Sequence, residues 1–204
     1  MTLRNLFVPV FLILSLAGVG LIIATRGTTK PPLNGFTLFI TQTSYPSTGS
    51  PIQTATKVRR QKSDGSWKIE TTYAGGRVDV VYGEPGRGVF AVNNQTQKLD
   101  YLSGSSTRPL ADIDWRTQPG FVGEETILGH QTFHLHSEDQ GQYTDSYMCP
   151  ELQGYPLRIV TGDSRTKTVF EVTQVILGEP AFESAPSLPV DKTRFEQKSQ
   201  LSNQ

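Results

Sequence analysis

Three histidines of the same strand parity are the first candidates for chemistry. His130, His134 and His136 lie two or four residues apart, so a strand that runs through them unbroken would place all three on one face. His-x-His pairs of this kind can bind zinc or copper. Gly129 begins a turn just before them, however, and no carboxylate or cysteine stands nearby at a matching spacing. The sequence therefore favours solvent-facing histidines, and we predict no metal site.

Other reactive residue types lack the partners that catalysis needs. Asp112 and Asp114 form an Asp-x-Asp pair, but no basic or glycine-rich segment surrounds it, which favours helix-capping or surface roles. The glycines of 83–88 lack the lysine, serine and helix of a phosphate loop, so they indicate a hairpin. Ser105 and Ser164 do not lie in a Gly-x-Ser-x-Gly motif. We expect a protein that is not an enzyme and carries no cofactor.

The elements that must position any site are strands. Apolar residues alternate with polar ones between turn signals at intervals of roughly ten residues, which is typical of half-buried antiparallel strands. Phe36, Leu38 and Ile40 share one face of the first strand, whereas the segment 54–61 is polar. The pattern predicts further strands at Trp67–Tyr73, Val78–Tyr82, Val89–Val92, Lys98–Leu102, Phe121–Leu128, Thr132–His136, Tyr143–Cys149, Leu157–Thr161 and Thr168–Leu177.

An apolar face is the candidate binding surface. A single sheet cannot bury such a face alone, and the loop around Trp115 is the cover that the chain itself offers. Two interpretations remain open: these side chains pack against one another as a core, or they line a cavity for an apolar ligand. The predicted ligand-binding residues are Trp67, Ile69, Tyr73, Phe90, Leu99, Tyr101 and Trp115.

The segment Leu6–Thr25 contains twenty residues without one charged side chain. As a helix it would reach about 30 Å, the thickness of the hydrocarbon core of a bilayer. Ser15-Leu16-Ala17 offers a signal-peptidase site, but cleavage there would leave an apolar tail. We therefore expect an uncleaved single-pass anchor in a bacterial inner membrane, with the main domain outside the cytoplasm. The alternative is a secreted or periplasmic protein after cleavage.

Composition limits the remaining choices. The formal net charge is zero and no basic cluster is present, which argues against a nucleic-acid partner. Cys149 is the only cysteine, so it cannot form a disulfide within the chain, and its place at the end of an apolar strand favours burial. The predicted organisation is a membrane anchor or signal at 1–26, a linker at 27–34, a β domain at 35–183 and a polar, disordered tail at 184–204.

The second half of the chain resembles a known family. The stretch GEETILGHQTFHLHSE from Gly123, the Pro150-Glu151-Leu152 turn and the Pro156-Leu157-Arg158 strand are similar to the closing strands of the LolA/LolB-like lipoprotein-carrier superfamily. The resemblance is clearest over residues 121–186. It implies an all-β fold, namely a single strongly curved antiparallel sheet that forms an unfinished half-barrel, here after an N-terminal transmembrane or signal helix. In such carriers the concave apolar face takes acyl chains.

Two functions follow as expectations. The first is a membrane-tethered extracytoplasmic binding module that holds a lipid acyl chain or another apolar ligand. The second is an interaction or sensor domain that binds another envelope protein through an open sheet edge, without a small ligand. A tethered module reaches lipid or partners near one membrane only, and the family's lipidation cysteine is absent from the end of the apolar segment. A local binding role is therefore favoured over long-range shuttling.

Overall fold

The computed structural model describes residues 35–104, 113–193 and 195. The chain divides into two compact units, Met1–Pro31 and Pro32–Gln204, and every described residue belongs to the second. The predicted anchor Leu6–Thr25 lies outside the described residues. Within the described part of the chain, no helix is long and apolar enough to cross a membrane.

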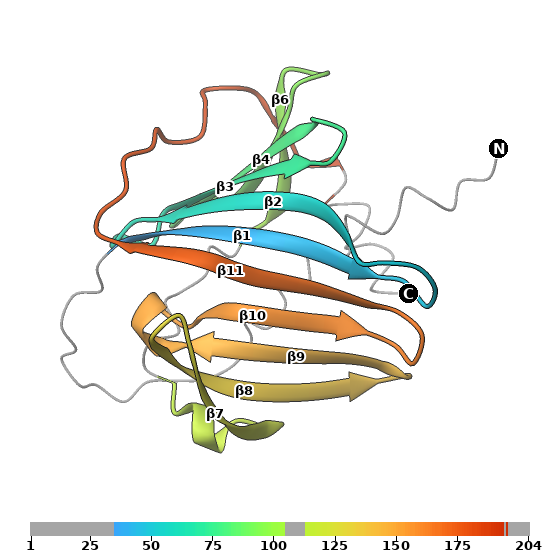
Figure 1. Ribbon diagram of the computed structural model, residues 1–204. Coiled ribbons are helices and arrows are strands. Elements are labelled where there is room, and N and C mark those ends of the chain that lie inside the picture. Colours follow the sequence, from blue (N-terminus) through green and yellow to red (C-terminus); the bar gives the residue numbers. More distant parts are fainter. Residues whose placement is uncertain (1–34, 105–112, 194, 196–204) are drawn as a thin grey trace. The chain divides into compact units, whose positions relative to one another are not determined.

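The described residues build one large sheet (Figure 1). Its order is β12-β6-β5-β4-β3-β2-β1-β11-β10-β9-β8-β7, and its two outermost strands do not pair with each other. The strands are β1 (Phe36–Tyr45), β2 (Ile52–Gln61), β3 (Trp67–Tyr73), β4 (Val78–Glu84), β5 (Gly88–Asn93), β6 (Lys98–Ser103), β7 (Phe121–Ile127), β8 (His130–Asp139), β9 (Gln142–Cys149), β10 (Tyr155–Gly162), β11 (Lys167–Leu177) and β12 (Val190–Asp191). This part of the chain also forms two short 3-10 helices, η2 (Trp115–Thr117) and η3 (Pro150–Leu152).

The middle of the sheet joins segments that are distant in sequence. Strands β1 and β11 lie side by side (Figure 1) and pair antiparallel from Phe36 with Leu177 to Tyr45 with Lys167. Every other neighbouring pair is a meander of consecutive strands, except that β12 pairs with β6 in parallel. The predicted fold class is thus confirmed in outline: the protein is all-β, with one unclosed and largely antiparallel sheet.

The register assigns side chains to two faces, because successive residues of a strand point to opposite sides. Across the sheet, Leu38 pairs with Arg59, Arg59 with Ile69, and Ile69 with Val81. We call the side that carries these residues and Trp67 the Trp67 face. The opposite side carries Tyr82, and we call it the Tyr82 face.

Strand β2 was not among the predicted strands. The segment 54–61 is polar in sequence, yet Ile52–Gln61 is a ten-residue strand that lies between β1 and β3. Its neighbours on both sides satisfy its backbone groups, so β2 needs no strong apolar alternation of its own. This strand matters for the site because it carries buried polar side chains.

Residues 184–191 pack on the sheet, although the sequence places them in the polar tail. Ala185 is buried, and Leu188 packs with it against Tyr82, Phe90 and Leu99. The backbone N–H of Ala185 donates a 2.7 Å hydrogen bond to the Glu84 carboxylate. Burial of a few apolar side chains on the Tyr82 face thus holds a segment that its composition marks as irregular.

Several local predictions are confirmed. Asp114 caps η2, and its carboxylate accepts the N–H of Arg116 at 3.1 Å. Asp112 lies outside the described residues. The glycines of 83–88 join β4 to β5 as a hairpin, in which Gly86 has φ 76°. Cys149 is fully buried, and burial raises the pKa of its thiol.

Candidate functional site

The seven predicted ligand-binding residues do not share one face. Trp67 and Ile69 pack with Val81 and Val89 on the Trp67 face. Phe90, Leu99 and Tyr101 belong to the cluster around Tyr82, on the other face. They are covered there by residues 185 and 188.

The other two predicted residues do not belong to the Trp67 cluster. Trp115 packs against Phe133 and Met148 in a separate cluster. Tyr73 pairs with Ala55 and carries the guanidinium of Arg77 4.3 Å from its ring centroid. The structure therefore brings Trp67 and Ile69 together, and places Tyr73 and Trp115 at other points.

Register explains this division. Trp67 pairs with Gly83, and Gly83 pairs with Val89, so Val89 joins Trp67 and its neighbour Phe90 points away. A shift of one residue moves a whole strand's side chains to the opposite face. Alternation within each strand is visible in sequence, whereas the register between strands is not.

Arg59 is a buried cation on the Trp67 face. Its guanidinium carbon lies 4.6 Å from the ring centroid of Trp67 and 4.5 Å from that of Tyr155. Its Nη2 donates a 2.5 Å hydrogen bond to the side-chain oxygen of Gln61, which is also buried. Burial lowers the pKa of Arg59, and interaction with Tyr155 opposes that shift. Among the described residues, the groups in contact with the Arg59 guanidinium are all neutral.

Two N–H groups in this stack have no hydrogen-bond partner. They are Nε of Arg59 and Nε1 of Trp67, and both are buried. A buried donor without a partner costs roughly 1–3 kcal/mol, so each such group calls for an explanation. The Trp67 ring packs directly over Gly83, where a Cβ would lie 2.1 Å from it.

Lys57 adds a second positive charge on the same face. It lies two residues from Arg59 along β2, and its ammonium nitrogen is 4.5 Å from the ring centroid of Phe170. Desolvation by burial lowers its pKa to about 8. Within the described part of the chain, neither Lys57 nor Arg59 forms an ion pair with a carboxylate.

Sequence reasoning missed Lys57, Arg59 and Gln61. The signal was their period of two with Ala55, which places all four on one side of a strand. Because three of the four are polar, hydrophobic alternation does not reveal them.

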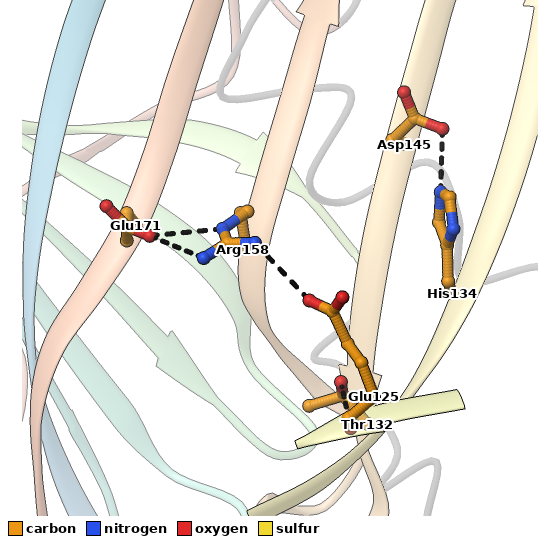
Figure 2. Close-up of polar contacts among 6 residues, drawn as sticks. All are labelled: Glu125, Thr132, His134, Asp145, Arg158 and Glu171. Carbon is orange, nitrogen blue, oxygen red and sulfur yellow. Dashed lines mark hydrogen bonds and ion pairs between the residues drawn. The ribbon is translucent and has the colours of Figure 1, made fainter. Parts of the chain in front are cut away.

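A second polar group lies on the Tyr82 face, away from the arginine stack. Arg158 donates from Nε and Nη2 to Glu171 at 3.1 and 2.8 Å and from Nη1 to Glu125 at 3.3 Å (Figure 2). These residues come from β10, β11 and β7 respectively. The Arg158 guanidinium also lies 5.4 Å from the ring centroid of Tyr147. In contrast to Arg59, this arginine has its charge balanced by carboxylates.

The candidate histidines lie near that group on β8. His134 and His136 both contact one carboxylate oxygen of Asp145, at 2.7 and 2.9 Å, and Figure 2 shows the first contact. His130 instead pairs with Glu151 at 2.7 Å. Burial raises the pKa of Asp145, but the hydrogen bonds and charges of the two histidines outweigh it and the net shift is downward. Within the described residues, no group of three or more histidines, cysteines or acidic residues is placed to hold a metal ion.

A shallow, open hollow of about 890 Å³ lies elsewhere, between the β2–β3 turn and residues 179–183. Ser63 N–H donates to Glu179 there, at 3.1 Å, and the Lys62 ammonium lies 4.5 Å from the ring centroid of Phe182. These contacts fasten the C-terminal segment to the turn. The hollow does not include the orphaned donors of the arginine stack, so we place the candidate site at the stack.

Solved structures match this chain, whereas no protein-family model and no curated protein does. A LolA superfamily protein from Nitrosomonas europaea is 11% identical, with 76% of this chain and 90% of that chain covered and a TM-score of 0.40. The complex of MucA and MucB from Pseudomonas aeruginosa matches with 19% identity, 78% and 59% coverage and a TM-score of 0.46. The lipoprotein LppX from Mycobacterium tuberculosis matches with 10% identity, 72% and 88% coverage and a TM-score of 0.35.

These matches confirm the predicted resemblance to LolA superfamily proteins as a moderate one. They span most of the LolA superfamily protein and of LppX, but less than two thirds of the MucB-complex chain. At these identities and TM-scores, no ligand, partner or compartment is concluded from them.

Proposed function

We propose that this chain is a membrane-tethered, non-catalytic binding module outside the cytoplasm, which holds a lipid acyl chain or another apolar ligand against the Trp67 face. One observation carries the proposal: two apolar, aromatic clusters lie on this face, around Trp67 and around Trp115, yet the described residues contain no second layer of sheet or long helix to cover them. A one-layer sheet must bury its apolar face against something. An elongated apolar ligand meets that need.

The location is part of the same proposal. The uncharged segment Leu6–Thr25 supports a single-pass anchor in a bacterial inner membrane, and a cleaved signal would give a periplasmic or secreted form instead. In the anchored and the periplasmic form, the sheet works in the cell envelope, where lipids and lipoproteins are the available apolar ligands.

The test is native mass spectrometry of the full chain purified from membranes, combined with uptake of a fluorescent fatty acid. We expect a co-purified mass in the range of a lipid, and uptake that saturates at one or a few molecules per chain. Clean protein that also fails to take up the fatty acid would contradict the proposal. Trp67→Ala is expected to reduce uptake, because it removes an indole ring from the face.

The alternative role, envelope protein binding by strand pairing, requires an accessible edge. Strand β7 is one edge of the sheet and lacks proline, and its Val122 is 59% exposed. Its register shifts between Phe121 and Gly123, however, and Glu124 and Glu125 are held in ion pairs. Register irregularities and charges are the usual protection against strand addition. The ligand-binding proposal therefore takes precedence.

A further inference from the structure

The Trp67 face has a charge that an apolar ligand alone does not explain. Arg59 is only 6% exposed, and among the described residues its charge meets two aromatic rings, the Tyr155 hydroxyl and one amide oxygen, all of them neutral groups. Cation–π contacts and a neutral hydrogen bond offset part of the cost of burying a cation, but they bring no opposite charge. Arg158 shows how this chain balances an arginine elsewhere, with two glutamates.

The unused donors mark where the missing partner would lie. The rings of Tyr155 and Trp67 lie against the guanidinium, so its remaining hydrogen bonds must form in its own plane. There Nη2 reaches Gln61 and Nε has no partner. The indole N–H of Trp67 is a second free donor in the same stack. Two buried donors and a cation thus lie in one stack, and these are the kinds of group that bind an oxyanion.

Lys57 extends this set of groups. It is on the same face of β2, two residues away, and it too lacks a carboxylate partner among the described residues. Between and around the two cations lie Leu38, Ile40 and Phe170, which are apolar and buried. The neighbourhood thus combines positive charge with apolar surface, which matches a molecule that has both an anionic group and a hydrocarbon chain.

We propose that Arg59, Trp67 and Lys57 bind the anionic headgroup, a carboxylate or a phosphate, of an amphiphile whose apolar chain lies along the Trp67 face. This inference rests on the proposed function and names its ligand class. The oxyanion accepts from Nε of Arg59 and from the Trp67 indole, and Lys57 supplies the second charge. An uncharged amphiphile leaves these donors unpaired and binds less tightly.

The experiment compares two photoreactive probes of equal chain length, a diazirine-bearing fatty acid and the corresponding fatty alcohol. The full chain is held in nanodiscs of zwitterionic phosphatidylcholine, and adducts are quantified by mass spectrometry. We expect the wild type to prefer the acid. Arg59→Met should lower the acid adduct about tenfold, the usual scale of one charge-assisted contact, and leave the alcohol adduct in place.

Matched controls separate charge from packing. Arg60→Met alters the neighbouring arginine, which points to the opposite face and pairs with Glu70, and should change neither adduct. Arg59→Lys retains the charge and should recover part of the acid preference. The alcohol adduct reports that each variant is folded.

Three outcomes would overturn the inference, each in a different way. Equal acid adducts in wild type and Arg59→Met would refute the headgroup site while the proposed function stands. Absence of both adducts from the wild type would refute the proposed function itself. Displacement of the acid probe by excess inorganic phosphate, with the alcohol adduct unchanged, would show that free phosphate is the occupant instead of a headgroup.

Discussion

At the scale of single residues, β2 carries two kinds of arginine side by side. Arg60 lies on one face and pairs with Glu70, whereas Arg59 lies on the other among rings and an amide. Adjacent residues of a strand meet different environments because they point to opposite faces. The desolvation penalty of a charged side chain is small where a carboxylate and water are near, and large where neither is. Arg59 and Lys57, which have no carboxylate partner among the described residues, are therefore the residues on which the ligand proposal rests.

Lys57 gives a prediction for the pH dependence of stability. Its pKa is about 8 in the folded protein and 10.5 for an unperturbed lysine, so between these pH values the unfolded chain binds more protons. The free energy of unfolding should therefore rise with pH over this window. We expect Lys57→Met to be more stable than the wild type at pH 7, and the gap to shrink by about 1–2 kcal/mol from pH 8 to pH 10.

Denaturant unfolding of both proteins from pH 6 to pH 10 measures this gap. Between pH 6 and pH 7 the gap should stay constant, because Lys57 is charged in both states there. A gap that does not change across pH 8 to 10 would show that Lys57 is solvated in the folded protein.

At the scale of elements, the strands that the sequence predicts are those in which apolar and polar residues alternate. Strand β2 lacks this alternation and was therefore missed. The sequence patterns of β3, β9 and β11 alternate clearly, and the structure places strands there. In β2, Lys57, Arg59 and Gln61 occupy the positions where apolar residues would mark a buried face. The polar residues that form the candidate site are therefore also the reason why hydrophobic alternation does not reveal the strand that carries it. Register also decides which side chains of neighbouring strands share a face. Turns and bulges set the register, and local sequence patterns do not show it.

A glycine in β4 gives a prediction at this scale. Gly83 pairs with Trp67, and a Cβ there would lie 2.1 Å from the indole ring. Gly83→Ala should force the ring out of its position and lower the free energy of unfolding by about 2 kcal/mol, the usual cost of overpacking. It should also change the emission of Trp67, because the ring moves relative to Arg59.

Gly75→Ala is the matched control, because a Cβ at Gly75 meets nothing within 4 Å. Its expected effect on stability is within about 0.5 kcal/mol. Chemical unfolding followed by tryptophan fluorescence measures both variants. Equal stability of the two would mean that the close approach of Trp67 and Gly83 has no energetic consequence.

At the scale of the whole described unit, the sheet depends on contacts between its two ends in sequence. Strand β1 pairs with β11, about 130 residues later, and β12 pairs with β6 and forms one edge of the sheet. The sequence shows the individual strands and their turns, but it does not show that the first long strand lies beside the last. Nor does it show that residues 184–191 are part of the fold. Such pairings arise from long-range register, which no local signal specifies.

The C-terminal segment supplies the last prediction. Ala185 and Leu188 cover Tyr82, Phe90 and Leu99, and Ala185 N–H is held by Glu84. Truncation after Glu179 should remove this cover and lower the free energy of unfolding by about 2 kcal/mol, because it removes the partly buried Leu188, the buried Ala185 and one buried hydrogen bond. Binding of a hydrophobic dye should rise, because the Tyr82 cluster becomes exposed. A chain truncated after Phe195 keeps these contacts and is the reference in both measurements. If both truncated chains unfold at the same denaturant concentration, the segment merely lies on the Tyr82 face and does not stabilise it.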